Sequence, residues 1–478
     1  MDTPVIPIAA GFARATRDEW LSLAAKTLKG AAVGTLAGAT PDGVAIQPLY
    51  SADGAAAPLP FEGGARGGER PWDVRAIVRH GEAAGANAQI LEALAGGAAS
   101  VLARIDPRGQ TGIAVSSADD MARLLDGVMI DVAPVALDAG FHGARCAQWL
   151  ANAAKASPAA PLAFHLEPLS AFAAAGASPG PIEAHVAACA KLGAGLAEPY
   201  PKAAVFLASG CAVHEAGGAP TWELAFAVAA ALAYAKALVA AGLAMRDAFE
   251  RIVVGLAIDQ DPLASIAKLR AARILWGAMT GACGVDLPAR IEARSSQRML
   301  TRADRWSNLV RLTAAGFAGA VGGADAIVLG AFTDATGPPD PFALRMARNT
   351  QLILMQEAYL GAVADPASGA WAFEALTADL ARAAWLDFTA IEAAGGLVQS
   401  LVDGLIAREV AASREALKGD IVGGRIKIIG VTDFQGGEED TGRQPSPAPC
   451  EPSGDAALPG PDSRCPPLVA VRLEDVAR

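Results

Sequence analysis

Short apolar runs alternate with longer helical segments along most of the chain. From residue 70 onward, the apolar runs predict strands at 99–105, 128–137, 161–165, 204–208, 251–258, 289–293 and 325–329, with a less pronounced one at 360–364. The intervening segments predict helices at 81–94, 142–155, 181–192, 221–240, 262–280, 302–321, 341–359 and 377–394. Alternating strands and helices form a mostly parallel sheet covered by helices. Eight such units favour an α/β fold of the (β/α)8 TIM barrel type, with an open doubly wound sheet as the alternative.

The two ends of the chain lack this alternation. Residues 1–62 are predicted to form an extended N-terminal arm, with one short helix at 20–28 capped by Asp18, before a Gly- and Pro-rich stretch. Such an arm builds no core of its own, so we expect it to lie on a partner chain. The barrel is expected to span 63–434. Residues 435–478 are rich in Gly, Pro and Ser and predict a disordered C-terminal tail, although the last dozen are more apolar and able to dock.

Composition restricts the partners and the compartment. With 53% hydrophobic and 19% charged residues among 478, the chain can bury a large core, and its net charge of −11 argues against a nucleic-acid or anionic-membrane surface. The longest apolar run, residues 224–245, is dominated by Ala and contains Lys236, which favours a buried helix over a membrane span. No basic segment precedes an apolar stretch near residue 1, so we expect no signal peptide and a cytoplasmic location.

The cysteines point to a reducing compartment. None forms a C-x-x-C pair, so we expect free thiols instead of disulfides or a zinc site. The six are widely spaced, at Cys146, Cys189, Cys211, Cys283, Cys450 and Cys465.

Several short blocks in residues 45–434 resemble the barrel of the methylmalonyl-CoA mutase family. Taken in order they are specific, although each alone would be weak. The blocks are Pro48 to Ser51, Arg70 to Arg75, Ser209 with Gly210, His214 to Gly217, Lys268 to Arg273, Arg348 to Gln351, Gln356 with Glu357, and Asp365 to Gly369. Two further blocks, Ser296 to Trp306 and Val321 to Ala326, resemble the small subunits of heterodimeric members.

The resemblance implies a TIM barrel that works with a flavodoxin-like cobalamin domain. Active members of the family rearrange the carbon skeleton of a CoA ester through radicals supplied by adenosylcobalamin. Their cobalamin domain carries an Asp-x-His-x-x-Gly loop. Here the nearest match is Glu183, Ala184 and His185, with Ala188 where Gly is required, on a predicted helix. The 44 residues after Phe434 are too few for several βαβ units, so we expect the chain to lack this domain.

The resemblance also implies polar groups inside the barrel that this chain has lost. The position of a family Tyr is Ile77, and that of a family Tyr-His pair is Cys211 and Ala212. A family Arg that grips the substrate carboxylate follows the third strand, yet no Arg occurs between Arg145 and Arg246. Ile and Ala cannot donate a hydrogen bond to a bound carbonyl. We therefore expect no catalytic residue and no bound cofactor or metal in this chain, with adenosylcobalamin in a partner subunit.

Three residues remain candidates for binding substrate at the barrel mouth: His214, Gln297 and Asn349. Each has a structural alternative, since a His beside a helix start is commonly a packed histidine and an Asn commonly a cap. Cys211 has no adjacent base and is expected to be an inert, buried thiol. The helix from Lys268 to Arg273 would either meet phosphates or form a solvated charged face, and we favour the solvated face.

Three functions stay open. The first is a non-catalytic small subunit of an adenosylcobalamin-dependent methylmalonyl-CoA mutase, paired with a large catalytic subunit that converts methylmalonyl-CoA to succinyl-CoA. The second is an active acyl-CoA mutase barrel that receives a cobalamin domain in trans. The third is a free scaffold protein derived from a mutase.

Overall fold

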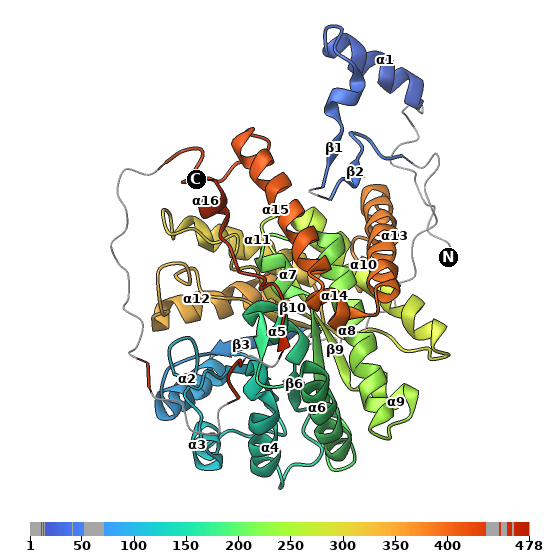
Figure 1. Ribbon diagram of the computed structural model, residues 1–478. Coiled ribbons are helices and arrows are strands. Elements are labelled where there is room, and N and C mark those ends of the chain that lie inside the picture. The colour runs from blue at the N-terminus through green and yellow to red at the C-terminus, as the bar shows by residue number, and fades with distance from the viewer. Residues whose placement is uncertain are drawn as a thin grey trace, which may run out of the picture.

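The core of the protein is a closed barrel of eight parallel strands (Figure 1). The computed structural model describes residues 11, 13, 15–40, 42–51, 71–435, 449–450, 457–460 and 463–477. The strand order is β10-β11-β3-β4-β5-β6-β8-β9. The strands are β3 (Asp73–Val78), β4 (Ser100–Arg104), β5 (Val135–Asp138), β6 (Ala163–Leu166), β8 (Ala204–Ser209), β9 (Ile252–Ile258), β10 (Ile291–Ser295) and β11 (Ala326–Val328). The predicted TIM barrel is confirmed.

The eighth strand lies at the start of the barrel, which corrects the prediction for residues 360–364. β3 pairs with β11 on one side and β4 on the other, and so closes the barrel. Residues 360–364 instead form a turn after the π-helix η3 (Ile353–Glu357). β3 was missed because Asp73 and Arg75 interrupt its apolar pattern. Asp73, Arg75 and Ile77 are two residues apart in the strand, so their side chains lie on the same face of β3, and this face points into the barrel.

Helices surround the barrel. They are α2 (Ala83–Ala95), α3 (Ala118–Leu124), α4 (Gly143–Ala153), α5 (Pro168–Ala175), α6 (Ile182–Ala197), α7 (Cys211–Glu215), α8 (Pro220–Ala240), α9 (Met245–Glu250), α10 (Pro262–Ala282), α11 (Ser307–Val321), α12 (Pro341–Leu352), α13 (Trp371–Ala393), α14 (Leu397–Val402) and α15 (Leu405–Val422). Pro220, Pro262 and Pro341 each begin a helix, where a missing N–H costs nothing. α13 packs outside α8 and α10 as an additional layer.

Helix α8 is a core helix, as predicted. Among the described helices it alone is long and apolar enough to cross a membrane. However, 67% of its most apolar window is buried inside the protein, where α8 packs against α13, α6, β8 and β9. All six cysteines lie among the described residues, and each is a free thiol.

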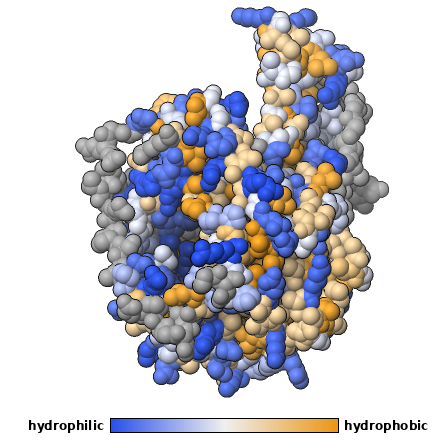
Figure 2. Space-filling model, in the orientation of Figure 1, coloured by the Kyte–Doolittle hydropathy of each residue, from blue (hydrophilic) through white to orange (hydrophobic). Residues whose placement is uncertain are grey.

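Of the predicted arm, residues 1–10, 12, 14, 41 and 52–62 lie outside the described residues, and the described helix projects from the barrel (Figure 1). This helix, α1 (Arg17–Thr27), buries no residue, and its N-cap is Thr16 rather than Asp18, because Thr16 and Glu19 form a reciprocal capping box. A hairpin of β1 (Gly38–Ala39) and β2 (Ala45–Ile46) follows. The Asp42 carboxylate in this hairpin accepts a hydrogen bond from the backbone N–H of Thr221 at 3.0 Å. Figure 2 shows apolar and polar side chains side by side on the projecting arm.

The C-terminal segment requires a correction. Residues 436–448, 451–456, 461–462 and 478 of the predicted disordered tail lie outside the described residues, but residues 463–477 are folded against the barrel. β12 (Ser463–Arg464) pairs antiparallel with β7 (Ala177–Ser178), and α16 (Leu473–Val476) ends the segment. The predicted disorder is wrong for this segment, whereas the expectation that the last dozen residues can dock agrees with the structure, because hydrogen-bond partners on the barrel satisfy their backbone.

Candidate functional site

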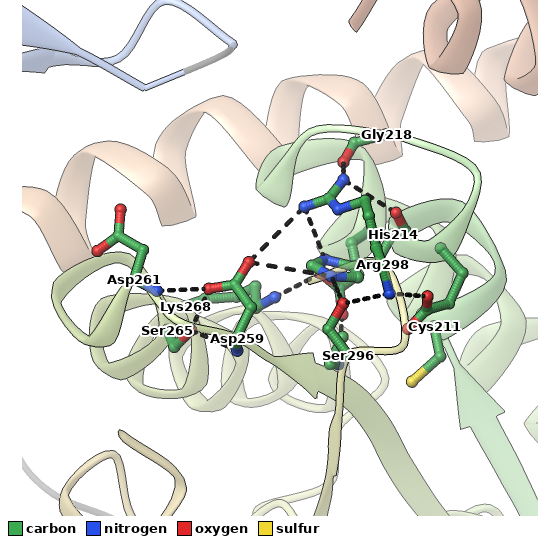
Figure 3. A network of polar contacts seen from close by, with 12 residues as sticks. Cys211, His214, Gly218, Asp259, Asp261, Ser265, Lys268, Ser296 and Arg298 are labelled. Carbon is green, nitrogen blue, oxygen red and sulfur yellow. Dashed lines mark hydrogen bonds and ion pairs between the residues drawn. The ribbon is translucent and has the colours of Figure 1, made fainter. Parts of the chain in front are cut away.

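Buried polar side chains gather where β8, β9 and β10 end, at the mouth of the barrel (Figure 3). His214 on α7 is almost fully buried. Its Nε2 lies 2.8 Å from the Ser296 hydroxyl, and its Nδ1 lies 3.4 Å from Glu223 Oε2. His214 is therefore held between Ser296, which follows β10, and Glu223 on helix α8.

Glu223 on α8 connects this network to β9 and α10. Its carboxylate is fully buried, accepts a hydrogen bond from the backbone N–H of Ala257 at 2.6 Å, and forms an ion pair of 2.5 Å with Lys268. Burial alone would raise the pKa of Glu223, but the Lys268 ammonium and the hydrogen bond to His214 lower it to about 2. The carboxylate stays charged at neutral pH, as a buried pair requires.

A second carboxylate organises the loop after β10. Glu215 accepts hydrogen bonds from the backbone N–H groups of Gln297 (2.9 Å) and Arg298 (2.8 Å). The Gln297 amide then donates to Asp334 at 3.3 Å. Arg298 donates to the carbonyl of His214 at 2.9 Å. These groups of the mouth are thus bonded mainly to one another.

The structure brings together two of the three predicted mouth residues. His214 and Gln297 both lie at the mouth, whereas Asn349 does not. Asn349 lies in the second half of α12, where its neighbour Arg348 packs against Gly96, which ends α2 just before β4. Since α12 descends from the end of β11 toward the start of β4, Asn349 lies near the opposite end of the barrel. Substrate binding by these residues stays a prediction.

The charged face of α10 is buried, contrary to the expected solvated face. Arg270 is 5% exposed and pairs with Asp365 (3.1 Å) and Glu374 (3.0 Å). The burial of this face could not be predicted from the spacing of charges along α10, because it results from packing of α13, a distant part of the chain, on α10. The cations on α10 hold the outer helices to the barrel and leave no cluster for a phosphate.

The barrel interior is apolar where the family carries its Tyr. Ile77 packs into a cluster formed by Leu102, Ala136, Ala163, Ala204, Leu207, Val253 and Val328. Cys211 and Ala212 begin α7 after β8. Burial raises the pKa of the Cys211 thiol to about 12, so it is not a thiolate at neutral pH.

A charged cluster that we did not predict also lies inside the barrel. Glu292 on β10 is fully buried and binds Arg75 of β3 and, at 2.7 Å, Arg294 of its own strand. Arg294 also pairs with Asp138 of β5 at 3.5 Å. Alternating charges in β3 and β10 were the available signal, because residues two apart in a strand share a face.

Two titratable groups border this cluster. Burial raises the pKa of Glu167 to about 8, against the lowering effect of Arg294. Burial also lowers the pKa of His165 to about 3, so its contact with Glu292 at 3.9 Å is not an ion pair at neutral pH. His165 has a φ of 44°, a left-handed conformation that is strained for a residue with a side chain.

The interior arginines are therefore already paired. Arg75, Arg104 and Arg294 each form an ion pair with a carboxylate of this chain, namely Asp73, Glu292 or Asp138. With Glu167 protonated, three positive charges face three negative ones. A substrate carboxylate that bound these guanidinium groups would therefore compete with Asp73, Glu292 and Asp138 for them.

The described residues do not fit a cobalamin ligand loop. His185 lies on barrel helix α6, half-buried, with its ring 5.4 Å from that of Phe141 in an edge-to-face contact. Among the described residues no group of three or more His, Cys, Asp or Glu is placed to hold a metal ion.

Comparison with known proteins adds to this geometry. Residues 60–451 match the family model described as methylmalonyl-CoA mutase. The chain is 36% identical over 467 residues to a methylmalonyl-CoA mutase small subunit of Streptomyces virginiae, covering 93% of this chain and 74% of that protein. It is 31% identical to the small subunit of Propionibacterium freudenreichii subsp. shermanii, covering 83% and 65%, and 27% identical to a methylmalonyl-CoA mutase of Escherichia coli, covering 88% and 64%. The chain thus spans between about two thirds and three quarters of the length of these relatives.

Proposed function

Because the chain belongs to the methylmalonyl-CoA mutase family, we propose that it is a non-catalytic small subunit of an adenosylcobalamin-dependent mutase. Its partner is a large subunit that binds the cobalamin and converts methylmalonyl-CoA to succinyl-CoA in the cytoplasm. Two similar proteins carry the name small subunit, which supports this assignment.

The observation that carries the proposal is the state of the barrel interior. The site that would hold the acyl group presents Ile77 and its apolar neighbours. A thioester carbonyl placed there would lose its water partners without gaining a donor, which costs about 1–3 kcal/mol per group. A substrate carboxylate would find arginines already paired, at a further cost of several kcal/mol.

We expect the isolated chain to show no turnover of methylmalonyl-CoA when adenosylcobalamin is added, and turnover only with the large subunit present. Titration calorimetry should detect no binding of methylmalonyl-CoA to the isolated chain at micromolar concentration. Turnover by the isolated chain, or saturable one-to-one binding with a micromolar Kd, would contradict the proposal. Activity gained with a cobalamin domain in trans and a different acyl-CoA would support an active barrel instead.

We also expect the arm to contact the partner. α1 buries none of its residues against the barrel, so its apolar side chains are free for another chain. Deleting residues 1–62 should abolish complex formation and leave the barrel folded. The point variant Leu23→Asp should weaken binding of the large subunit at least about tenfold, or 1.4 kcal/mol, because a charge would enter the interface.

The matched control is Leu386→Asp on α13. Leu386 is 65% exposed and Leu23 is 63% exposed, so both changes perturb the surface equally. Surface plasmon resonance with immobilised large subunit measures both. If the truncated chain co-purifies at full yield, or if the two variants bind equally well, the arm is not the contact.

A further inference from the structure

Residues 463–477, called here the C-terminal strap, cross the mouth of the barrel. In Figure 1 the strap is the dark red segment that runs from β12 in front of the barrel to α16. Along this path it contacts the loops that follow β6, β8, β10 and β11. These loops form the C-terminal face, from which ligands of a TIM barrel enter.

Backbone hydrogen bonds hold the strap along its whole length. It begins as an added strand, because β12 pairs with β7. Its N–H groups then donate to the carbonyls of Gly176 (3.0 Å), Ala173 (2.8 Å), Glu215 (2.8 Å) and Arg298 (2.9 Å). Extended peptides are recognised in this way when they add to a sheet edge or line a groove.

Arg472 sits where the strap reaches the site network. Its guanidinium donates to the carbonyls of Gln297 at 2.8 Å and Leu300 at 3.4 Å, and Nη2 lies 3.5 Å from the carbonyl of Asp334. Arg472 is half-buried, and burial lowers the pKa of its guanidinium. Nearby, Arg302 forms an ion pair of 2.8 Å with Glu474.

Apolar side chains fix the strap at both ends. Cys465 and Leu468 are buried against the main core, and Leu473 and Val476 pack with Leu417 on α15. Between these anchors Val469 is 60% exposed. The pattern is that of a peptide with separate anchor positions, rather than of a segment interleaved with the barrel strands.

We propose that the barrel mouth is a peptide-binding site and that the strap is its tethered ligand. The ligand class is an extended peptide with a leucine followed four residues later by Arg-Leu-Glu. The strap begins 12 residues beyond the last residue matched by the family model, so the fold of the family does not demand it. This inference is independent of the partner proposed above.

The test cuts the full chain after it has folded. A protease site replaces residues 440–446, the purified protein is cleaved, and gel filtration shows whether the C-terminal fragment stays bound. We expect the fragment to co-elute with the barrel. Arg472→Ala in the same protein should release it, because three carbonyls lose their donor, whereas Arg464→Ala should not, since Arg464 is exposed.

The affinity of the barrel mouth for the strap is then measured. A fluorescent peptide of residues 461–478 is added to the cleaved protein and displaces the bound fragment. We expect the Arg472→Ala peptide to bind at least about tenfold more weakly than the unchanged peptide, and the Arg464→Ala peptide to bind within about twofold. Loss of the unchanged fragment on gel filtration, or equal binding of the two variant peptides, would overturn the proposal.

A second measurement uses the uncut, unaltered chain. Pulsed alkylation with mass spectrometry compares Cys465 in the strap with Cys189, which is buried within α6. A strap that detaches while the barrel stays folded gives much faster labelling of Cys465 than of Cys189. Equal labelling rates would mean that the strap leaves only when the barrel unfolds, and would refute a separable ligand.

Discussion

Replacing Glu292 with alanine is expected to lower the free energy of unfolding by about 3–5 kcal/mol, because the change leaves Arg75 and Arg294 buried without a shared counter-charge. Glu292 has no exposed surface, so water cannot replace it. Urea denaturation followed by circular dichroism measures the effect. The matched control is Glu392→Ala, whose partner Lys236 is 63% exposed and which should cost less than about 1 kcal/mol.

The same variant should alter the acid response. Burial alone would raise the pKa of Glu292, but the charges of Arg294, His165 and Arg75, in that order, hold it well below its usual range. A carboxylate with a depressed folded pKa stabilises the protein above its unfolded pKa of 4.5, and that stability is lost as pH falls toward the folded value. The difference between wild type and Glu292→Ala should therefore shrink on acidification below pH 4.5. A cost under about 1 kcal/mol at pH 7, or one that does not change with pH, would mean that the interior ion pairs contribute little.

Glu167→Gln is expected to gain stability over the wild type as pH rises. Burial raises the pKa of Glu167 from 4.5 to about 8, so the folded state keeps a proton that the unfolded state releases. Stability from this group is complete below pH 4.5 and is lost as pH rises through 8. Gln stays neutral at every pH, so its stability relative to wild type should increase between pH 5 and pH 9 by on the order of 3–4 kcal/mol.

The measurement is a series of urea denaturation curves at five pH values. Glu198→Gln is the control, because Glu198 is exposed at the end of α6 and should track the wild type at every pH. If Glu167→Gln and Glu198→Gln respond alike, Glu167 is ionised in the folded protein at neutral pH and the balance of three arginines against three carboxylates does not hold.

The sequence by itself determined the barrel and the family. Seven of the eight strands were predicted, and apart from β10 with its Glu292 and Arg294 they are mainly apolar, since strands buried on both faces of a parallel barrel need no polar alternation. The residues at Ile77, Cys211 and Ala212 predict the loss of family hydrogen-bond donors without any coordinates, because side-chain chemistry is read directly from residue type. Gln297 and His214 were also placed at the mouth by order along the chain, since the ends of barrel strands converge there.

Only the tertiary structure decided which charges meet. In the sequence, Asp73 and Arg75 argue against a strand at β3. In the structure, Glu292, more than two hundred residues away, lies beside them and neutralises Arg75. Similarly, the sequence predicts Lys268 as a surface cation, whereas in the structure Glu223 of α8 lies 2.5 Å from its ammonium group. The strap follows this rule, because its sequence indicated that the last dozen residues can dock but not where, and the carbonyls that receive Arg472 and the strap backbone come from distant loops of the barrel mouth. The local sequence pattern predicts whether a segment is exposed to water and which local structure it forms. A buried charge or a docked peptide depends on partners from distant parts of the chain, which only the fold brings within reach.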